Sequence, residues 1–262
     1  SPGTEWYVGK KVGEIWGYTV NDLFRTQEEL DEYLSKTDPK AIGVNWRTGD
    51  LRYEDINGDG KVDNGKNTVS DHGDMSVIGN DQPHYIFGIM PGFSYKGFDF
   101  SMLWSGVMKR DLYFGTNANL YWGFSPSWWE GALQKRNLDY FRDEPGTKYV
   151  GLHEGDANIN TDAFWPRPYL NGTEMNKNYN NPNTRYLVNA AYIRMQNIQL
   201  GYSFPKKWIS KLQLEKVKIY FSGDNLLTFT KLPDGIDPEI PNGANLTYGA
   251  DRVCSFGLII SY

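Results

Sequence analysis

The last ten residues constrain the fold most, because large apolar and small side chains alternate there up to the final residue of the sequence. At the two-residue period of an extended strand, one face carries Phe256, Leu258, Ile260 and Tyr262. The other face carries Ser255, Gly257, Ile259 and Ser261. This pattern is typical of a membrane barrel strand, with lipid outside and a wet or plugged lumen inside. A half-buried strand of a soluble sandwich alternates in the same way, so the rest of the chain must distinguish the two.

Composition narrows the classes of fold and partner. Aromatic residues make up 15% of 262 residues, with 28 Gly and 13 Pro, which favours strands and turns in one large all-β domain or two smaller ones. The net charge of -5, with basic residues spread along the chain, argues against a nucleic-acid partner. The sequence has no apolar run of 18 residues, so no membrane-spanning helix is predicted. Cys254 has no second cysteine to pair with and is expected to be buried or to face lipid.

Six segments have the alternation of strands, and a phase change near Gln196 and Asn197 indicates a bulge in the fourth. The segments are 10–20, 85–95, 98–105, 193–203, 217–230 and 253–262. Between the first two, Thr26 and Glu29 have the spacing of a capping box, which predicts a short amphipathic helix from Thr26 to about Lys36.

The connections between these segments alternate strictly between short and long. Those at 95–97 and 204–215 are short, whereas those at about 20–83, 109–190 and 231–248 are long. Outer-membrane barrels have short periplasmic turns on one side and long external loops on the other, and a sandwich has no reason to sort its loops in this way. Six strands cannot close a barrel of this kind, and an open edge is not tolerated in hydrocarbon. We therefore expect residues 1–262 to be the C-terminal segment of a longer barrel, or to be completed by another chain.

Several short blocks then resemble one family, in order along nearly the whole chain. They are Gly13–Tyr18 with Leu23, Phe24 and Glu28–Leu30, Gly49–Lys61, Ile78–Asn80, Tyr95–Asp99, Tyr192–Asn197 with Leu200–Tyr202, and Ser222–Leu226. They look like the SusC/RagA-type TonB-dependent outer-membrane transporters of Bacteroidetes. The resemblance covers only the C-terminal part of such a transporter, because nothing resembles the N-terminal plug or the earlier strands.

The resemblance implies a large barrel of about 22 antiparallel strands in the cell outer membrane, in contact with membrane lipid. It also implies import of glycans or oligopeptides, energised by TonB through the missing N-terminal part, with a SusD-like surface lipoprotein as lid. The alternative function is that of a soluble, calcium-stabilised β-sandwich that binds glycans.

One acidic loop has the oxygen spacing of a calcium site. Positions 1, 3, 5, 7 and 9 of an EF-hand-type loop are filled by Asp55, Asn57, Asp59, the carbonyl of Lys61, and Asp63. Position 12 is Lys66 in place of the usual Glu, so a sixth ligand would come from Asp71 or Asp74. We expect structural Ca²⁺ here, and the alternative is a solvated acidic turn.

Aromatic residues of the second long loop are candidates for contact with substrate or lid. These residues are Trp122, Trp128, Trp129 and Trp165, together with Arg167 and Tyr169. The alternative is that they pack the long loops together. Catalysis has little support. The three histidines, His72, His84 and His153, lack the spacing of a metal motif, and no GxSxG, P-loop or GxGxxG motif opens a helix after a strand. We expect that the protein is not an enzyme.

Overall fold

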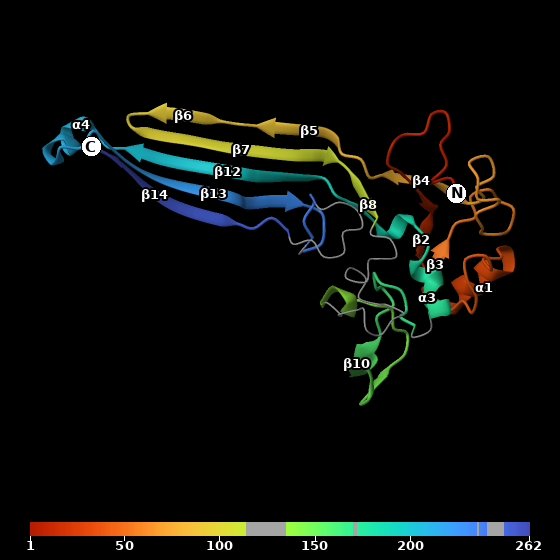
Figure 1. The fold of residues 1–262 in the computed structure, drawn as a ribbon. Coiled ribbons are helices and arrows are strands. Elements are labelled where there is room, and N and C mark those ends of the chain that lie inside the picture. Colours follow the sequence, from red (N-terminus) through yellow and green to blue (C-terminus); the bar gives the residue numbers. More distant parts are fainter. Residues whose placement is uncertain (114–134, 170–171, 235, 240–248) are drawn as a thin grey trace. The chain divides into compact units, whose positions relative to one another are not determined.

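The computed structural model describes the chain apart from residues 114–134, 170–171, 235 and 240–248 (Figure 1). The chain forms two compact units. The loop unit consists of Ser1–Asp81 and Leu112–Leu187, and the sheet unit consists mainly of Gln82–Asp111 and Val188–Pro241 with the C-terminal strand. Two short strands, β8 (Asp111–Tyr113) and β11 (Leu187–Asn189), lie where the chain passes from one unit to the other.

The sheet unit is one antiparallel sheet of six strands, which confirms the predicted all-β fold class (Figure 1). Its strands are β5 (His84–Ile89), β6 (Gly92–Tyr95), β7 (Phe98–Lys109), β12 (Tyr192–Ser203), β13 (Lys216–Thr230) and β14 (Val253–Ser261). The order across the sheet is β14-β13-β12-β7-β5, and β6 continues alongside β7. β5 and β6 keep one register against β7, and the break between them contains Pro91, which has no N–H to donate.

The two faces of the sheet differ in polarity, as the alternation predicted. On the apolar face, aromatic rings meet across neighbouring strands in the pairs Phe93–Phe100, Phe98–Tyr202 and Phe221–Phe256. On the opposite face, Lys218 forms an ion pair with Asp99 at 2.8 Å. Serines and Gln199 occupy neighbouring positions of that face, because Gln199 pairs with both Ser101 and Ser222.

The short connections lie at one end of the sheet. Lys96 and Gly97 form a two-residue turn between β6 and β7, and both have positive φ, as a tight hairpin turn requires. At the same end, α4 (Lys206–Ile209) and the 3-10 turn η4 (Ser210–Leu212) connect β12 to β13. Glu215 donates its backbone N–H to the Ser261 carbonyl, which places the end of β14 there as well. The predicted sorting of short connections to one end is confirmed.

Two details of the strand prediction have different outcomes. The bulge predicted near Gln196 and Asn197 is confirmed, because the register of β12 shifts there against both neighbouring strands. The prediction that residues 10–20 form a wall strand is wrong. Glu14–Tyr18 form β1, which pairs with β4 (Met75–Asn80) in the loop unit, where Tyr18 is buried, and Val20 already belongs to the next short strand. A period of two cannot tell a face that meets lipid from a face that meets a protein core.

The loop unit contains small sheets, helices and turns. A second strand pair consists of β2 (Val20–Leu23) and β3 (Leu51–Tyr53), and a third of β9 (Gly146–Thr147) and β10 (Val150–Gly155). The helices among its described residues are α1 (Gln27–Lys36) and α3 (Gly172–Tyr179), with 3-10 turns η1 (Lys135–Leu138), η2 (Asp156–Asn158) and η3 (Thr184–Tyr186). No helix among the described residues is long and apolar enough to span a bilayer.

The predicted helix is confirmed together with its cap. Thr26 is the N-cap of α1, and its side chain accepts the Glu29 backbone N–H at 3.3 Å. Glu29 returns a bond to the backbone N–H of Arg25, one residue earlier than the usual capping box has it. Leu30 is the buried residue of the helix.

The described parts of the predicted long loops at 20–83 and 109–190 pack into a core. Its fully buried side chains include Leu23, Phe24, Leu51, Tyr53, Phe141 and Tyr186. Residues far apart in sequence meet there, since Asn178 accepts a hydrogen bond from the Leu51 backbone N–H at 3.0 Å. The two loops therefore form a folded unit and are not independent structureless connections.

Candidate functional site

A buried polar network organises the part of the loop unit that carries two predicted contact residues. Asp50 follows Gly49, whose φ of 86° is positive, at the turn before β3. Its carboxylate accepts hydrogen bonds from the Tyr169 hydroxyl at 2.8 Å and from the Asn178 amide at 2.9 Å. It also forms an ion pair of 2.8 Å with Lys177 of α3, and both of these side chains are fully buried. Asp50 thus holds α3 and the segment around Tyr169 against the turn.

Lys177 is stabilised on several sides. Its ammonium donates to the backbone carbonyls of Val44 and Asn45, at 3.2 and 2.7 Å. It also lies 4.5 Å from the centre of the Tyr169 ring, within cation–π range. Burial raises the pKa of the Tyr169 hydroxyl well above its ordinary value, and the adjacent Asp50 carboxylate adds to this effect. Tyr169 is therefore a neutral hydrogen-bond donor at physiological pH.

A pocket of about 310 Å³ opens next to this network. Three arginines line it, Arg47, Arg142 and Arg167, and Tyr169 forms another part of its wall. Arg167 is fixed by an ion pair with Asp143 at 2.5 Å and by a hydrogen bond to the Thr48 carbonyl at 2.9 Å.

The other two arginines are held to different degrees. Arg142 donates to backbone carbonyls, including that of Asn158 at 2.6 Å. Arg47 is exposed and lies 3.9 Å from Glu174, and its guanidinium donates no hydrogen bond to the described residues. An exposed guanidinium beside a phenol ring can bind a carboxylate, a phosphate or a sugar hydroxyl.

The predicted contact residues have three different outcomes. Arg167 and Tyr169 line the pocket, half-buried. Trp165 is only 3% exposed and stacks on Tyr186 with ring centres 6.0 Å apart, so it packs the loop unit, as the alternative interpretation had it. Trp122, Trp128 and Trp129 lie outside the described residues.

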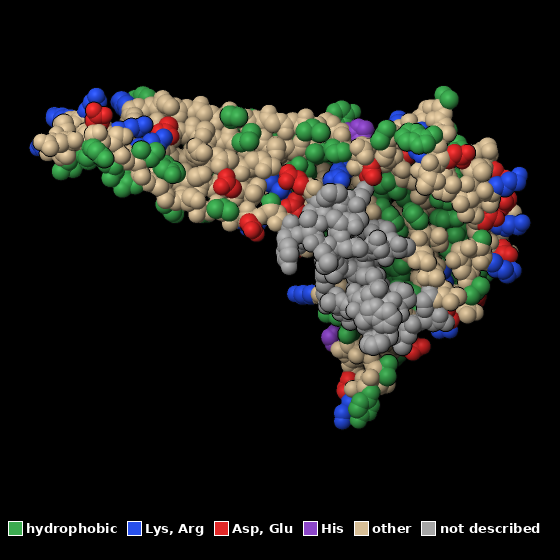
Figure 2. Space-filling view, viewed as in Figure 1, with side chains coloured by type: hydrophobic (Ala, Val, Ile, Leu, Met, Phe, Trp, Pro, Cys, Tyr) green, Lys and Arg blue, Asp and Glu red, His purple; other side chains and the backbone are tan. Residues whose placement is uncertain are grey.

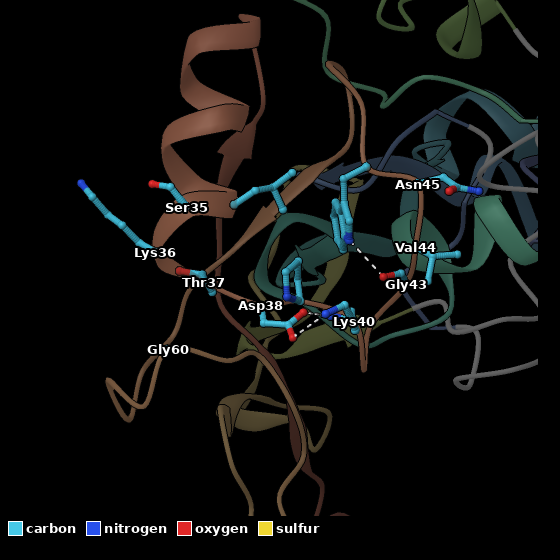
Figure 3. A pocket seen from close by; sticks show the side chains of 12 residues that line it. Ser35, Lys36, Thr37, Asp38, Lys40, Gly43, Val44, Asn45 and Gly60 are labelled. Atoms are coloured by element: carbon cyan, nitrogen blue, oxygen red, sulfur yellow. Dashed lines mark hydrogen bonds and ion pairs between the residues drawn. The ribbon is translucent and has the colours of Figure 1, made fainter.

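A second pocket lies at the C-terminal end of α1 (Figure 3). Its lining includes Leu34, Pro39, Val44 and Trp46 beside polar residues of the segment 35–40. Asp38 and Lys40 form an ion pair of 3.0 Å. Figure 3 shows these two side chains pointing toward one another, while Lys36 extends away. Lys36 is paired instead with Glu32. The charges around this pocket are thus already paired, and it offers mainly shape and the Trp46 indole, whose N–H donates to the Gly43 carbonyl.

In the acidic loop at 55–63, carboxylate side chains accept hydrogen bonds from backbone N–H groups of the same loop. Asp55 accepts the N–H groups of Gly58 and Gly60, and Asp59 accepts that of Lys61. Asp74, one of the two suggested sixth ligands, accepts the N–H groups of Ile56, Asn57 and Asp63. Among the described residues no three His, Cys, Asp or Glu side chains are gathered as a metal site. The calcium site stays a prediction for Asp55, Asn57, Asp59, the Lys61 carbonyl and Asp63.

The sequence interpretation missed Asp50, Lys177 and Arg47 as parts of one arrangement. Asp50 lies within one of the resembling blocks, and this was the only available signal for it. Lys177 lies in the run Asn176–Asn181, which gives no sign of burial, because lysine is seldom fully buried. Arg47 meets Tyr169 through a contact between residues more than one hundred positions apart, with 5.9 Å between guanidinium and ring centre.

The curated proteins that the chain resembles share one description, TonB-dependent receptor. No family model matches the chain. It is 24% identical over 231 residues to TonB-dependent receptor P3 of Formosa agariphila, which covers 88% of this chain and 19% of that protein. It is 23% identical to TonB-dependent receptor SusC of Bacteroides thetaiotaomicron, over 87% of this chain and 18% of that protein. The chain thus spans about a fifth of the length of the curated relatives that it matches.

Solved structures share the fold. The RagAB peptide transporter matches over 96% of this chain and 23% of its own, with a TM-score of 0.58 and 16% identity. The RagAB peptide importer in its "closed-closed" state matches over 98% of this chain with a TM-score of 0.59.

Proposed function

The chain resembles TonB-dependent receptors of the SusC type, as its sequence predicted, and from this premise we propose that it forms part of an outer-membrane transporter for nutrients. In this proposal the sheet unit is a section of the barrel wall. Its apolar face contacts lipid and its polar face lines the lumen. The long connections, which leave the sheet after Lys109 and re-enter it at His84 and Tyr192, are then external.

The observation that carries this proposal is the exposure of the apolar face. Phe256 is 84% exposed and Phe98 51%, and their strands contribute to one continuous row of apolar side chains. Within the described residues of the sheet unit no second sheet packs on this face. A soluble sandwich requires such a second sheet, because an uncovered apolar face of this size costs free energy in water. The soluble glycan-binding alternative therefore lacks support.

The polar face supports a lumen-side role. Near the long-connection end, Arg194 of β12 is buried and forms ion pairs with Asp237 at 2.6 Å and with Glu239 at 2.7 Å. These acids belong to the connection after β13, so the pairs hold that connection on the sheet. Such a cluster would be costly in hydrocarbon and is compatible with a protein-filled or wet lumen.

We propose oligopeptides or glycans as the transported substrates, TonB as the source of energy and a SusD-like lipoprotein as the lid. The names of the relatives support this general class, and RagAB is described as a peptide transporter. Within the loop unit, the pocket with Arg47, Arg167 and Tyr169 is the proposed contact for substrate or lid. Purification from native membranes in mild detergent should then yield the protein together with a surface lipoprotein.

The wall proposal can be tested at two neighbouring residues of β14. Cys254 is the single cysteine and is exposed on the same strand face as Phe256 and Leu258. An environment-sensitive fluorophore on Cys254, in the protein reconstituted into vesicles, should be quenched by lipids that carry quenchers in their acyl chains. The matched control places the label on Ser255→Cys in a Cys254→Ser background, where it faces the other side and should be quenched by a water-soluble reagent. Equal quenching of both labels by the aqueous reagent would refute the wall assignment.

The acidic loop carries a separate proposal. We propose that Ca²⁺ binds within residues 55–63 in a structural role, supported by five oxygen positions at calcium-loop spacing and by the tight turn at Gly58 and Gly60, both with positive φ. A sixth oxygen would come from Asp71 or Asp74.

A further inference from the structure

The connection between β12 and β13 exposes apolar and basic side chains together at the short-connection end of the sheet unit. Trp208 is 61% exposed and Leu212 is 69% exposed, although Ile209 between them is buried. Backbone hydrogen bonds tie this connection to the strand ends, since Phe204 donates to Val217 at 2.9 Å and Glu215 donates to Ser261 at 2.8 Å. The exposed Trp208 and Leu212 are thus held by a fixed structure.

Trp208 continues the apolar face of the sheet. A chain of ring contacts runs from Phe98 to Tyr202 at 4.5 Å, from Tyr202 to Phe204 at 5.2 Å, and from Phe204 to Trp208 at 6.4 Å. The proposed lipid-facing surface therefore extends without a break onto α4. Indole side chains are favoured at the level of lipid headgroups, where one edge stays wet.

Five exposed lysines lie at the same end of the sheet as this apolar extension. They are Lys96, Lys206, Lys207, Lys211 and Lys216. None of them forms an ion pair with the described residues, in contrast to Lys218, which is paired with Asp99. Glu215 is the only acidic residue between Tyr202 and Lys218. Figure 2 shows the basic side chains gathered over the end of the sheet that carries α4.

We propose that this end of the sheet binds anionic phospholipids in the leaflet on the short-connection side. Trp208 and Leu212 enter the boundary of the acyl chains, and the five lysine ammonium groups contact the headgroup phosphates. A cluster of four or more basic residues beside an inserted apolar surface is the pattern that selects anionic over zwitterionic lipid. This inference rests on the proposed barrel wall, because it needs the apolar face in the membrane.

The experiment uses the protein purified from its membrane and reconstituted with spin-labelled phosphatidylglycerol or spin-labelled phosphatidylcholine. The fraction of motionally restricted label gives the relative affinity of the two lipids. Wild type should prefer phosphatidylglycerol several-fold, and high salt should reduce the preference. The triple variant Lys206→Gln, Lys207→Gln, Lys211→Gln should lose most of the preference. The control variant Lys11→Gln, Lys135→Gln, Lys148→Gln removes the same charge from exposed positions of the loop unit and should keep it.

A second readout follows the insertion of Trp208. Acyl-chain brominated lipids should quench part of the tryptophan fluorescence. Trp208→Phe should reduce that part, and Trp104, which shares the apolar face of β7 with Phe98 and Phe100, should account for quenching that remains. If wild type shows no preference for phosphatidylglycerol, or the triple variant keeps it, the proposal is wrong. The two proposals fail separately: a Cys254 label quenched from the acyl chains with no lipid preference refutes only the anionic-lipid site, whereas a label quenched only from water refutes the wall itself.

Discussion

The carboxylate of Asp50 lies 2.8 Å from the ammonium of Lys177, and neither side chain is exposed to solvent. Two buried charges are tolerated only when each is paired and hydrogen-bonded, and both conditions hold here. Asp50 accepts from Tyr169, Asn178 and the Arg47 backbone N–H, and Lys177 donates to two carbonyls. The pair therefore joins the turn before β3, α3 and the segment of Tyr169 in one arrangement.

Asp50→Asn should destabilise the loop unit strongly, because it leaves Lys177 as a buried charge without a counter-ion. Breaking a buried pair in this way costs about 3–5 kcal/mol. The measurement is the midpoint of thermal unfolding, together with the rate of proteolysis within residues 40–60.

The matched control for this prediction is the exposed pair of Glu32 and Lys36 on α1, at 2.6 Å. Glu32→Gln removes the same charge where solvent screens it, so the loss of stability should be much smaller than that of Asp50→Asn. If the two variants lose similar stability, burial does not determine the contribution of the Asp50 pair.

Acid should loosen the wall of the arginine pocket through Asp143. Burial alone would raise the pKa of Asp143, but hydrogen bonds from Thr48 and Arg167 outweigh it and hold the pKa below the ordinary value of 3.8. Because the folded-state pKa is lowered, the stabilisation is present above pH 3.8 and is lost as the pH falls through the lowered pKa. Backbone hydrogen exchange of residues 140–145 should therefore become faster as the pH falls below 3.8. The rates are compared after correction for the pH dependence of exchange in an unfolded chain.

Asp143→Asn gives the control for the acid effect. In this variant, hydrogen exchange of residues 140–145 at neutral pH should already be as fast as in the acidified wild type. Acidification should then increase the exchange rate only slightly. An unchanged acid response in the variant would assign the effect to other carboxylates.

The alternation of residues predicted five of the six segments well, since 85–95, 98–105, 193–203, 217–230 and 253–262 all lie in the sheet unit. It failed for 10–20, because Trp16 and Tyr18 alternate in the same way against a protein core. The cap of α1 was predictable because Thr26 and Glu29 act through local backbone contacts. The arginine pocket was only partly predictable. Arg167 and Tyr169 were identified by residue type, but Asp50, Lys177 and Arg47 meet them through contacts between distant parts of the sequence.

Ca²⁺ should stabilise the segment 50–75 if the predicted site forms. A ligand present at about one hundred times its dissociation constant adds about 2.7 kcal/mol to the folded state. Chelation should therefore speed hydrogen exchange in this segment of the wild type, and Asp59→Ala should abolish the response to chelator. Asp162→Ala, at an exposed acid outside the loop, should leave the response intact. If neither Ca²⁺ nor chelator changes hydrogen exchange in this segment of the wild type, the loop is a solvated acidic turn and the calcium prediction is wrong.

Two glycines of the sheet should respond differently to a methyl group. At Gly106 of β7, an added Cβ would overlap the backbone carbonyl oxygen of Tyr192 and come within 2.8 Å of the Phe87 ring. At Gly201 of β12, the nearest atoms are the ends of the Asp99 and Lys218 side chains, at 2.6 Å, and these can move aside. Tyr192 begins β12 and is paired with strands on both sides, so its backbone cannot shift without disturbing the ladder, and Gly106→Ala should cost about 1–3 kcal/mol. Gly201→Ala should change stability by about 0.5 kcal/mol or less, although it displaces the ion pair. Thermal unfolding of the two reconstituted variants, compared at one protein-to-lipid ratio, shows which substitution costs more stability. A larger loss for Gly201→Ala than for Gly106→Ala would show that β7 and β12 do not pair as described.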